Sequence, residues 1–310
     1  MPDDKIKPKY RYIAKLSITV GLIIYLLHSC NISLLMSTFV SINASVAFIV
    51  FVTSLLLFLS GALNLWLILN SIHHIPLILF IQSYSYSYIV NLFTPGQLGD
   101  ISVAIFLKKH GIYYSRSTLA YVVDKAISMV FILLLGYIGA KVLLKDVAGP
   151  LWLFAIPPIC VVFALACMVL ILYIPYKSSQ IGRAKQFLLN IYNEALLWDT
   201  KYKAIILNII LTIARWLLLS LTYYLAFCAF GIEVTWPEVG IIPIISTLIG
   251  YMPISVGGIG TVELCAVYLF SLISVDRVYV IDVYIFLRFI TYVQAGLILG
   301  LSNWRFRQQR

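Results

Sequence analysis

The sequence predicts an all-α integral membrane protein with about six full transmembrane helices and two re-entrant hairpins of broken helices. Of its 310 residues, 62% are hydrophobic and only 11% are charged, whereas soluble domains are about one quarter charged. The mean hydropathy is +0.99. The longest stretch without an apolar span is 176–203, which is shorter than the roughly 50 residues that a domain with its own core needs. We therefore expect no soluble catalytic domain.

Six segments are long and apolar enough to cross the hydrocarbon core, which takes about 20 residues as a helix. They are residues 12–29, 45–69, 117–140, 151–174, 204–230 and 279–301. Two further apolar regions, 75–107 and 239–275, are interrupted by glycine and proline. Interrupted backbone at membrane depth has to be buried in protein or face a wet cavity, which favours re-entrant hairpins. If both halves of a hairpin crossed instead, the chain would still return to the same side.

Basic residues predict the orientation, because cytoplasmic loops are enriched in lysine and arginine. With the N-terminus inside, sixteen of the 22 lysines and arginines lie on the cytoplasmic side, and Lys141, Lys145 and Arg277 lie outside. We predict a multi-pass protein of the cytoplasmic membrane with both termini in the cytoplasm. The basic residues behind the net charge of +10 flank apolar segments instead of clustering on a polar surface, so no nucleic acid is expected as a partner.

The domain organisation that we predict is a single membrane domain, 1–310, with one repeat at 45–140 and a second at 204–301. A cytoplasmic interfacial linker, 175–203, joins the repeats. Apolar residues recur at helical spacing from Gly182 to Trp198, which predicts a helix lying on the inner surface. An ordinary amphipathic linker is the alternative.

The two interruptions, 91–100 and 252–263, share a glycine pattern. At one offset of 161 residues, Gly96 aligns with Gly257 and Gly99 with Gly260. In the predicted orientation the first hairpin enters from the cytoplasm and the second from outside. This arrangement is typical of the inverted repeats of transporters, whose substrate site lies near the midplane between the broken elements.

The interruptions also predict an anion site, because glycine-rich turns expose N–H groups and the following half-helix adds the positive end of its dipole. The candidate binding residues here are Asn91, Pro95, Gly96, Gly99, Asp100, Gly257, Gly258, Gly260 and Glu263. Asp100 and Glu263 lie in the first turn of the following half-helices. Each carboxylate can cap free N–H groups or contact a substrate cation.

Charged residues inside the predicted spans complete the candidate set: Asp124, Lys125, Arg215 and Arg288. Burying a charge at the bilayer centre costs at least about 2.5 kcal/mol, so these side chains should face the protein interior. In one interpretation they form internal ion pairs with one another and with the carboxylates of the interruptions. In the other, the arginines bind a lipid phosphate while the carboxylates contact an amine or sugar hydroxyls.

Several other patterns are interpreted without a special role. The tyrosines at 84, 86 and 88 cover a broad helical arc, and we interpret them as interface anchors, with cavity lining as the alternative. The five cysteines and four histidines lack metal-ligand spacing, so neither a metal nor a cofactor is expected. The phosphate-binding loop Gly-x-x-x-x-Gly-Lys-[Ser/Thr] is not present in the sequence, so transport would be passive or ion-coupled.

Taken together, these motifs resemble the transmembrane region of lysylphosphatidylglycerol synthases, a family of flippase-like membrane proteins. The residues that carry the resemblance are Asn91 with Pro95, Gly99 and Asp100, then Asp124-Lys125, then Pro253 through Gly257-Gly258-Ile259-Gly260 to Glu263, and Arg288 with Tyr292 and Gly296. Val103 and Asp124-Lys125 depart from the pattern, where many members have an arginine and a Glu-Arg pair. The resemblance implies a stand-alone member without the soluble synthase domain, which handles polar lipids.

Three functions remain open at this point. The leading hypothesis is polar-lipid translocation, with membrane lipids as partners and no catalytic residue. The second is a membrane-embedded enzyme acting on lipid-linked sugars or aminoacylated lipids, with Asp100, Asp124 or Glu263 as acid or base. The third is an accessory subunit that binds a lipid-modifying enzyme or a glycosyltransferase.

Overall fold

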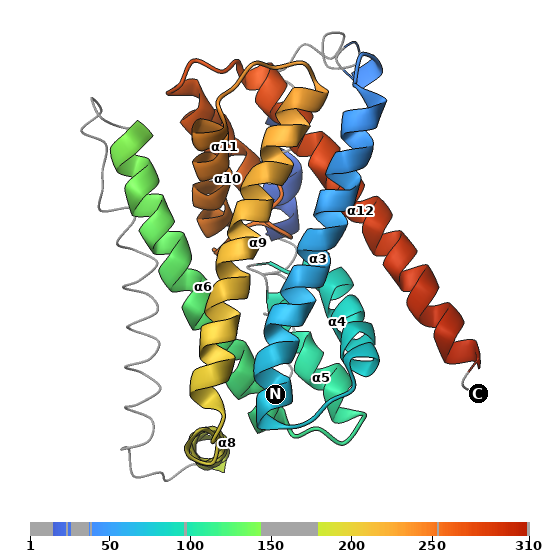
Figure 1. Ribbon diagram of the computed structural model, residues 1–310, viewed down its shortest axis with the longest axis vertical. Helices are drawn as coiled ribbons and strands as arrows, with labels where there is room; N and C mark the ends of the chain where they lie inside the picture. The colour runs from blue at the N-terminus through green and yellow to red at the C-terminus, as the bar shows by residue number, and fades with distance from the viewer. Residues whose placement is uncertain are drawn as a thin grey trace, which may run out of the picture. The chain divides into compact units, whose positions relative to one another are not determined.

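The computed structural model describes residues 15–22, 24–25, 37, 39–95, 98–143, 179–252 and 254–308. Within these ranges the regular elements are helices, apart from an isolated antiparallel bridge between Pro95 and Val256. The helices, shown in Figure 1, are α3 (Ala44–Ile72), α4 (Leu77–Leu92), η1 (Leu98–Ile101), α5 (Ser102–Lys108), α6 (Tyr114–Leu143), α8 (Ser179–Leu196), α9 (Lys201–Ala229), α10 (Trp236–Tyr251), α11 (Thr261–Ser271) and α12 (Arg277–Gln308). The predicted all-α class is confirmed.

Four of the described helices are long and apolar enough to cross a membrane. They are α3, residues 114–139 of α6, α9, and residues 277–301 of α12. These helices coincide with four of the six predicted spans and extend a few residues beyond most of their ends. The predicted span 151–174 and part of 12–29 lie outside the described residues, so the number of six stays a prediction.

The two interrupted regions are broken where the sequence predicts. α4 ends at Leu92, and the short helices η1 and α5 follow it. α10 ends at Tyr251, ten residues before α11 begins at Thr261. α4 and α10 each have 16 residues, α11 has 11 and α5 has 7, whereas crossing takes about 20. These lengths suit re-entrant hairpins, which stay a prediction because the structure contains no membrane.

The chain forms two compact units. Unit 1 consists of Met1–Phe58, Ser85–Asp100 and Trp216–Arg310, and unit 2 of Leu59–Tyr84 and Ile101–Arg215. The units do not follow the predicted repeats, because α3, α4 and α9 each contribute residues to both of them. The repeat boundaries therefore stay a prediction.

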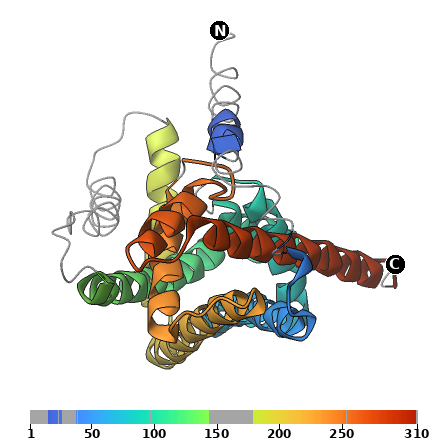
Figure 2. The same ribbon diagram turned by 90° about the horizontal axis from the view of Figure 1, so that it is seen from above.

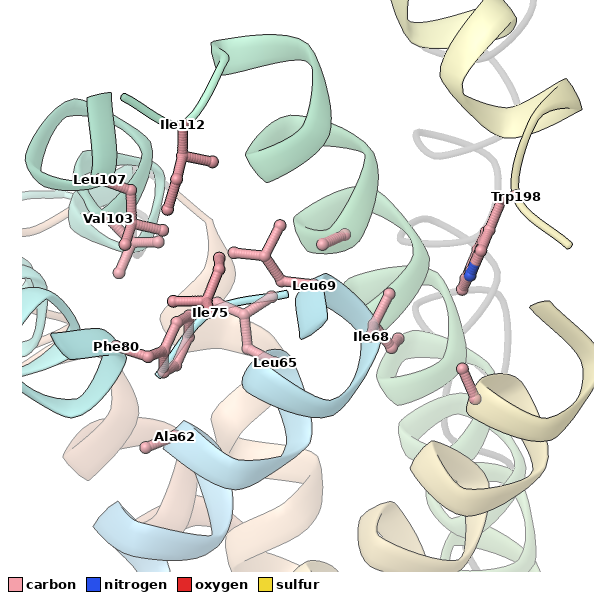
Figure 3. Close-up of a cluster of buried hydrophobic side chains, with 12 residues drawn as sticks. Ala62, Leu65, Ile68, Leu69, Ile75, Phe80, Val103, Leu107, Ile112 and Trp198 are labelled. Atoms are coloured by element: carbon pink, nitrogen blue, oxygen red, sulfur yellow. The ribbon is translucent and has the colours of Figure 1, made fainter. Parts of the chain in front are cut away.

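Unit 2 is built around an apolar core to which five helices and their connections contribute. Figure 3 shows this cluster, in which Leu65 and Leu69 of α3 lie close to Ile75 and Phe80. α8 packs against α6, and it is seen end-on in Figure 1 but along its length in Figure 2, so its axis crosses that of α6 steeply. A helix that lies on the membrane surface would cross a neighbouring membrane-spanning helix in this way. The predicted linker helix is thus confirmed, and its position on the membrane surface stays a prediction.

Unit 1 contains the second interrupted region. α11 packs against both α10 and α12. Aromatic pairs contribute to the packing, with ring centroids 4.9 Å apart for Phe227 and Phe270. Gln294 of α12 donates from Nε2 to the carbonyl oxygen of Phe51 at 2.7 Å, which joins α12 to α3. These contacts hold the half-helix α11 and the candidate residue Arg288 in one framework.

Candidate functional site

The first interruption is shaped by a close backbone approach. Gly99 lies against the last turn of α4, where a Cβ on Gly99 would overlap the backbone of Asn91. The Gly99 carbonyl accepts a hydrogen bond from Ser87 Oγ at 2.8 Å. Glycine is therefore required at position 99 because no side chain fits. Gly96 lies outside the described residues, and of Asp100 only its backbone place in η1, one turn before α5, is described.

The second interruption depends on left-handed backbone geometry. Gly257, Gly258 and Gly260 have φ angles of 60°, 71° and 85°, a region in which side chains are disfavoured. A Cβ on Gly257 would also lie 2.5 Å from the carbonyl oxygen of Leu92. The turn therefore approaches the end of α4 closely.

The two interruptions meet in unit 1. The Gly257 N–H donates to the Thr94 carbonyl at 3.1 Å, beside the bridge between Pro95 and Val256. Val256 N–H donates to Thr19 Oγ1 at 2.9 Å. The two segments are therefore adjacent, and backbone groups without a helical partner satisfy one another across the contact.

We expect Gly257→Ala to separate the two interruptions. The added Cβ lies too close to the Leu92 carbonyl, and left-handed geometry costs a non-glycine residue about 1–2 kcal/mol. The melting temperature in detergent should therefore fall. Gly300→Ala in α12 is the matched control, because a Cβ there meets nothing within 4 Å. Equal melting temperatures for the two variants would contradict the tight contact.

An ion pair joins the second interruption to α12. Arg288 Nε donates to Glu263 Oε1 at 2.8 Å, and Arg288 Nη1 donates to the Gly257 carbonyl at 3.0 Å. The other carboxylate oxygen, Glu263 Oε2, accepts the Gly260 N–H at 2.7 Å. The Glu263 side chain is 7% exposed and the Arg288 side chain 27%. Glu263 therefore caps α11, one of its two expected roles, and also fixes the arginine.

A cavity of about 250 Å³ opens in unit 1 beside this ion pair. Its polar lining comes from Tyr88, Asn91, Tyr223, Thr247, Tyr284, Arg288 and Thr291. Among the described residues of this lining, Arg288 is the charged one, and Glu263 pairs with its Nε. The described contacts of the guanidinium use Nε and Nη1, so its Nη2 group can donate to an anion.

Asn91 adds a second polar group to the cavity. Its side-chain oxygen is buried and has no hydrogen-bond partner in the part of the chain that the structure describes. Since the amide can be turned by 180°, this position can present either an acceptor or an NH₂ donor. A buried polar atom without a partner is costly, and a ligand in the cavity would satisfy it.

Three of the other charged candidates, Asp124, Lys125 and Arg215, belong to unit 2 and are not among the residues that line this cavity. Asp124 is 3% exposed and accepts a hydrogen bond from Asn208 Nδ2 at 3.0 Å. Lys125 Nζ lies 5.5 Å from the centroid of the Tyr121 ring. The Arg215 guanidinium lies 3.3 Å from where a Cβ on Gly61 would be, so the missing side chain makes room for it.

Tyr88 lines the cavity, which was the alternative interpretation for the tyrosines of this segment. Sequence reasoning missed several other groups in this region. Tyr284, Leu287, Arg288 and Thr291 follow helical spacing on α12, and this periodicity around Arg288 was the signal that could have revealed them. Asp282, fully buried in α12, was also missed among the acidic residues at depth.

Comparison with known proteins identifies the family. Neither a search of curated proteins nor a search of solved structures gives a match. The family model described as the lysylphosphatidylglycerol synthase TM region matches residues 12–300, a range that contains both interruptions and the ion pair. The chain therefore belongs to the lysylphosphatidylglycerol synthase transmembrane-region family, as the resemblance of its motifs predicted.

Proposed function

We propose that this chain translocates a polar lipid across the cytoplasmic membrane, and that Arg288 binds the phosphate of the headgroup in the unit 1 cavity. The observation that carries the proposal is an arginine fixed by Glu263 and the Gly257 carbonyl at the wall of a cavity whose described lining residues include no carboxylate. Arginine presents its donors in a plane that suits phosphate. The lipid chains would stay in the bilayer.

Membership of the family supports handling of polar lipids. Hydroxyl groups of Thr247, Thr291 and the lining tyrosines are suited to the glycerol or sugar hydroxyls of a headgroup. The two interruptions would be the re-entrant elements of an inverted repeat, with the substrate between them. In this proposal the remaining candidates, Asp124, Lys125 and Arg215, support the fold or the transport cycle from unit 2.

Catalysis by the carboxylates is less well supported. Both oxygens of Glu263 accept strong hydrogen bonds, one from Arg288 and one from Gly260, which leaves this carboxylate poorly suited to act as a base. Asp124 is buried in unit 2 beside Asn208. We therefore rank the enzyme below the translocator, and an accessory role beside a lipid-modifying enzyme stays a proposal of the third rank.

Reconstitution tests the function directly. The purified chain is inserted into liposomes that contain a fluorescent phospholipid, and a membrane-impermeant quencher is added from outside. A translocator brings label from the inner leaflet to the quencher, so nearly all fluorescence should be lost. Loss limited to the outer leaflet, as in protein-free liposomes, would reject translocation of that lipid.

The proposed orientation predicts a labelling pattern. In a variant that lacks the five native cysteines, single cysteines at positions 109 and 185 should react with an impermeant maleimide only after the cells are permeabilised. A cysteine at position 277 should react in intact cells, because Arg277 is exposed at the start of α12 and is predicted to lie outside. Labelling of position 185 but not 277 in intact cells would reverse the orientation.

A further inference from the structure

A second cavity lies in unit 2, in the groove between the loop before α6 and the helix α8. We call it the α8 groove. It has a volume of about 560 Å³ and is lined mainly by Lys108, Tyr113, Tyr114, Ser115, Phe187 and Asn190. All of these residues belong to unit 2, so the groove is a different site from the Arg288 cavity, and nothing in the proposed function uses it.

The groove combines one cation with exposed aromatic rings. Lys108 Nζ lies 4.5 Å from the centroid of the Tyr114 ring. Tyr113 is 68% exposed, and Phe187 is 38% exposed. The residues of the groove lining that the structure describes include no carboxylate. Its charge therefore favours an anion, and its walls offer apolar area next to that charge.

The first turn of α6 contributes a further donor. Ser115 lines the groove and is 9% exposed. A lysine, a serine hydroxyl and the Asn190 amide together form a suitable set of donors for a phosphate group.

Contacts between α6 and α8 hold the walls of the α8 groove in place. Arg116 Nε lies 3.0 Å from Glu194 Oε1 and 3.1 Å from Glu194 Oε2, which ties the first turn of α6 to α8. Arg116 Nη1 also lies 3.1 Å from His73 Nδ1. Because Arg116 is engaged in these contacts, Lys108 is the cation among the described lining residues that is available to a ligand.

The position along α6 points to a lipid as the source of the phosphate. The candidate membrane span in α6 begins at Tyr114, which would put the groove at the end of a span, where phospholipid headgroups are found. Exposed tyrosine and lysine side chains are typical of that level. We propose that the α8 groove binds the headgroup of an anionic phospholipid of the surrounding membrane.

Native mass spectrometry of the purified chain tests this site. The protein is released from detergent micelles with equal amounts of dioleoyl phosphatidylglycerol and dioleoyl phosphatidylcholine. Phosphatidylglycerol should be retained preferentially, and Lys108→Gln should lower its retention about fivefold, as expected for one lysine at a membrane surface. Lys109→Gln is the matched control, because Lys109 is equally exposed but does not line the groove.

The same measurement in Arg288→Gln separates this site from the proposed transport cavity. The bound phosphatidylglycerol that depends on Lys108 should persist in Arg288→Gln. Equal losses in the two lysine variants, equal retention of the two lipids, or complete displacement by soluble glycerol phosphate would each overturn the proposal. So would phosphatidylglycerol binding that is lost in Arg288→Gln and unchanged in Lys108→Gln, a result that would leave the translocation proposal intact.

Discussion

Replacing Arg288 by glutamine is expected to abolish lipid transport, because it removes the charged side chain among the described residues of the cavity lining. A hydrogen bond to a charged group contributes about 1.5–3 kcal/mol, so binding of a headgroup phosphate should fall by at least roughly tenfold. The amide of the shorter glutamine takes the place of the arginine Nε, so it can still donate to Glu263 but does not reach the Gly257 carbonyl. Quencher accessibility in liposomes, with equal amounts of reconstituted protein, measures the effect.

The matched control is Arg277→Gln, which removes an equal charge from the exposed start of the same helix. It should transport at the wild-type rate. Transport at the wild-type rate in Arg288→Gln would rule out the phosphate site altogether. Arg215→Gln extends the comparison to unit 2, where the arginine lies beside Gly61 and outside the cavity lining.

The sequence predicted those features that depend on local chemistry. Interruptions at Pro95 and at Gly257–Gly260 follow from the fixed φ of proline and from backbone angles that only glycine adopts readily. Four spans followed from apolar length. The cap on α11 was foreseeable too, because a carboxylate at the third helical position can reach back to the Gly260 N–H.

The arrangement of side chains around the cavity could not be predicted in the same way. Several acid–base pairings were open, and only the packing of α11 on α12 selects Glu263 with Arg288. Asp124 is buried as expected, yet its described partner is the amide of Asn208. The burial of Asp124 and Glu263 could be predicted from the sequence, but the direction that each side chain faces depends on contacts between distant helices.

Tyr88 illustrates the same limit. Its spacing from Tyr84 and Tyr86 left two interpretations open, and the structure shows the less favoured one, cavity lining, for Tyr88. Phe58 packs against Tyr88 with ring centroids 5.0 Å apart. The spacing of residues within α4 does not indicate which residue of another helix packs against Tyr88.

The second large effect is expected for Glu263→Gln, which should chiefly lower stability. The variant leaves the Arg288 charge without its carboxylate, and breaking a buried pair costs about 3–5 kcal/mol. We expect the lower end, about 3 kcal/mol, because 27% of the Arg288 side chain is exposed and water screens part of the charge. The Gly260 N–H also loses its charged acceptor. Unfolding in detergent mixtures measures the change.

A double variant separates stability from binding. The double variant Glu263→Gln with Arg288→Gln removes both charges, so it should recover much of the stability that Glu263→Gln loses. The difference between its loss of unfolding free energy and the sum of the two single losses measures the coupling of the pair. It should still fail to transport lipid, because the phosphate has lost its cation. Glu263→Gln keeps that cation and should retain measurable transport wherever folded protein reaches the liposome. If the double variant transported lipid once its stability had recovered, the ion pair would be purely structural, and the phosphate would have to bind elsewhere in the protein.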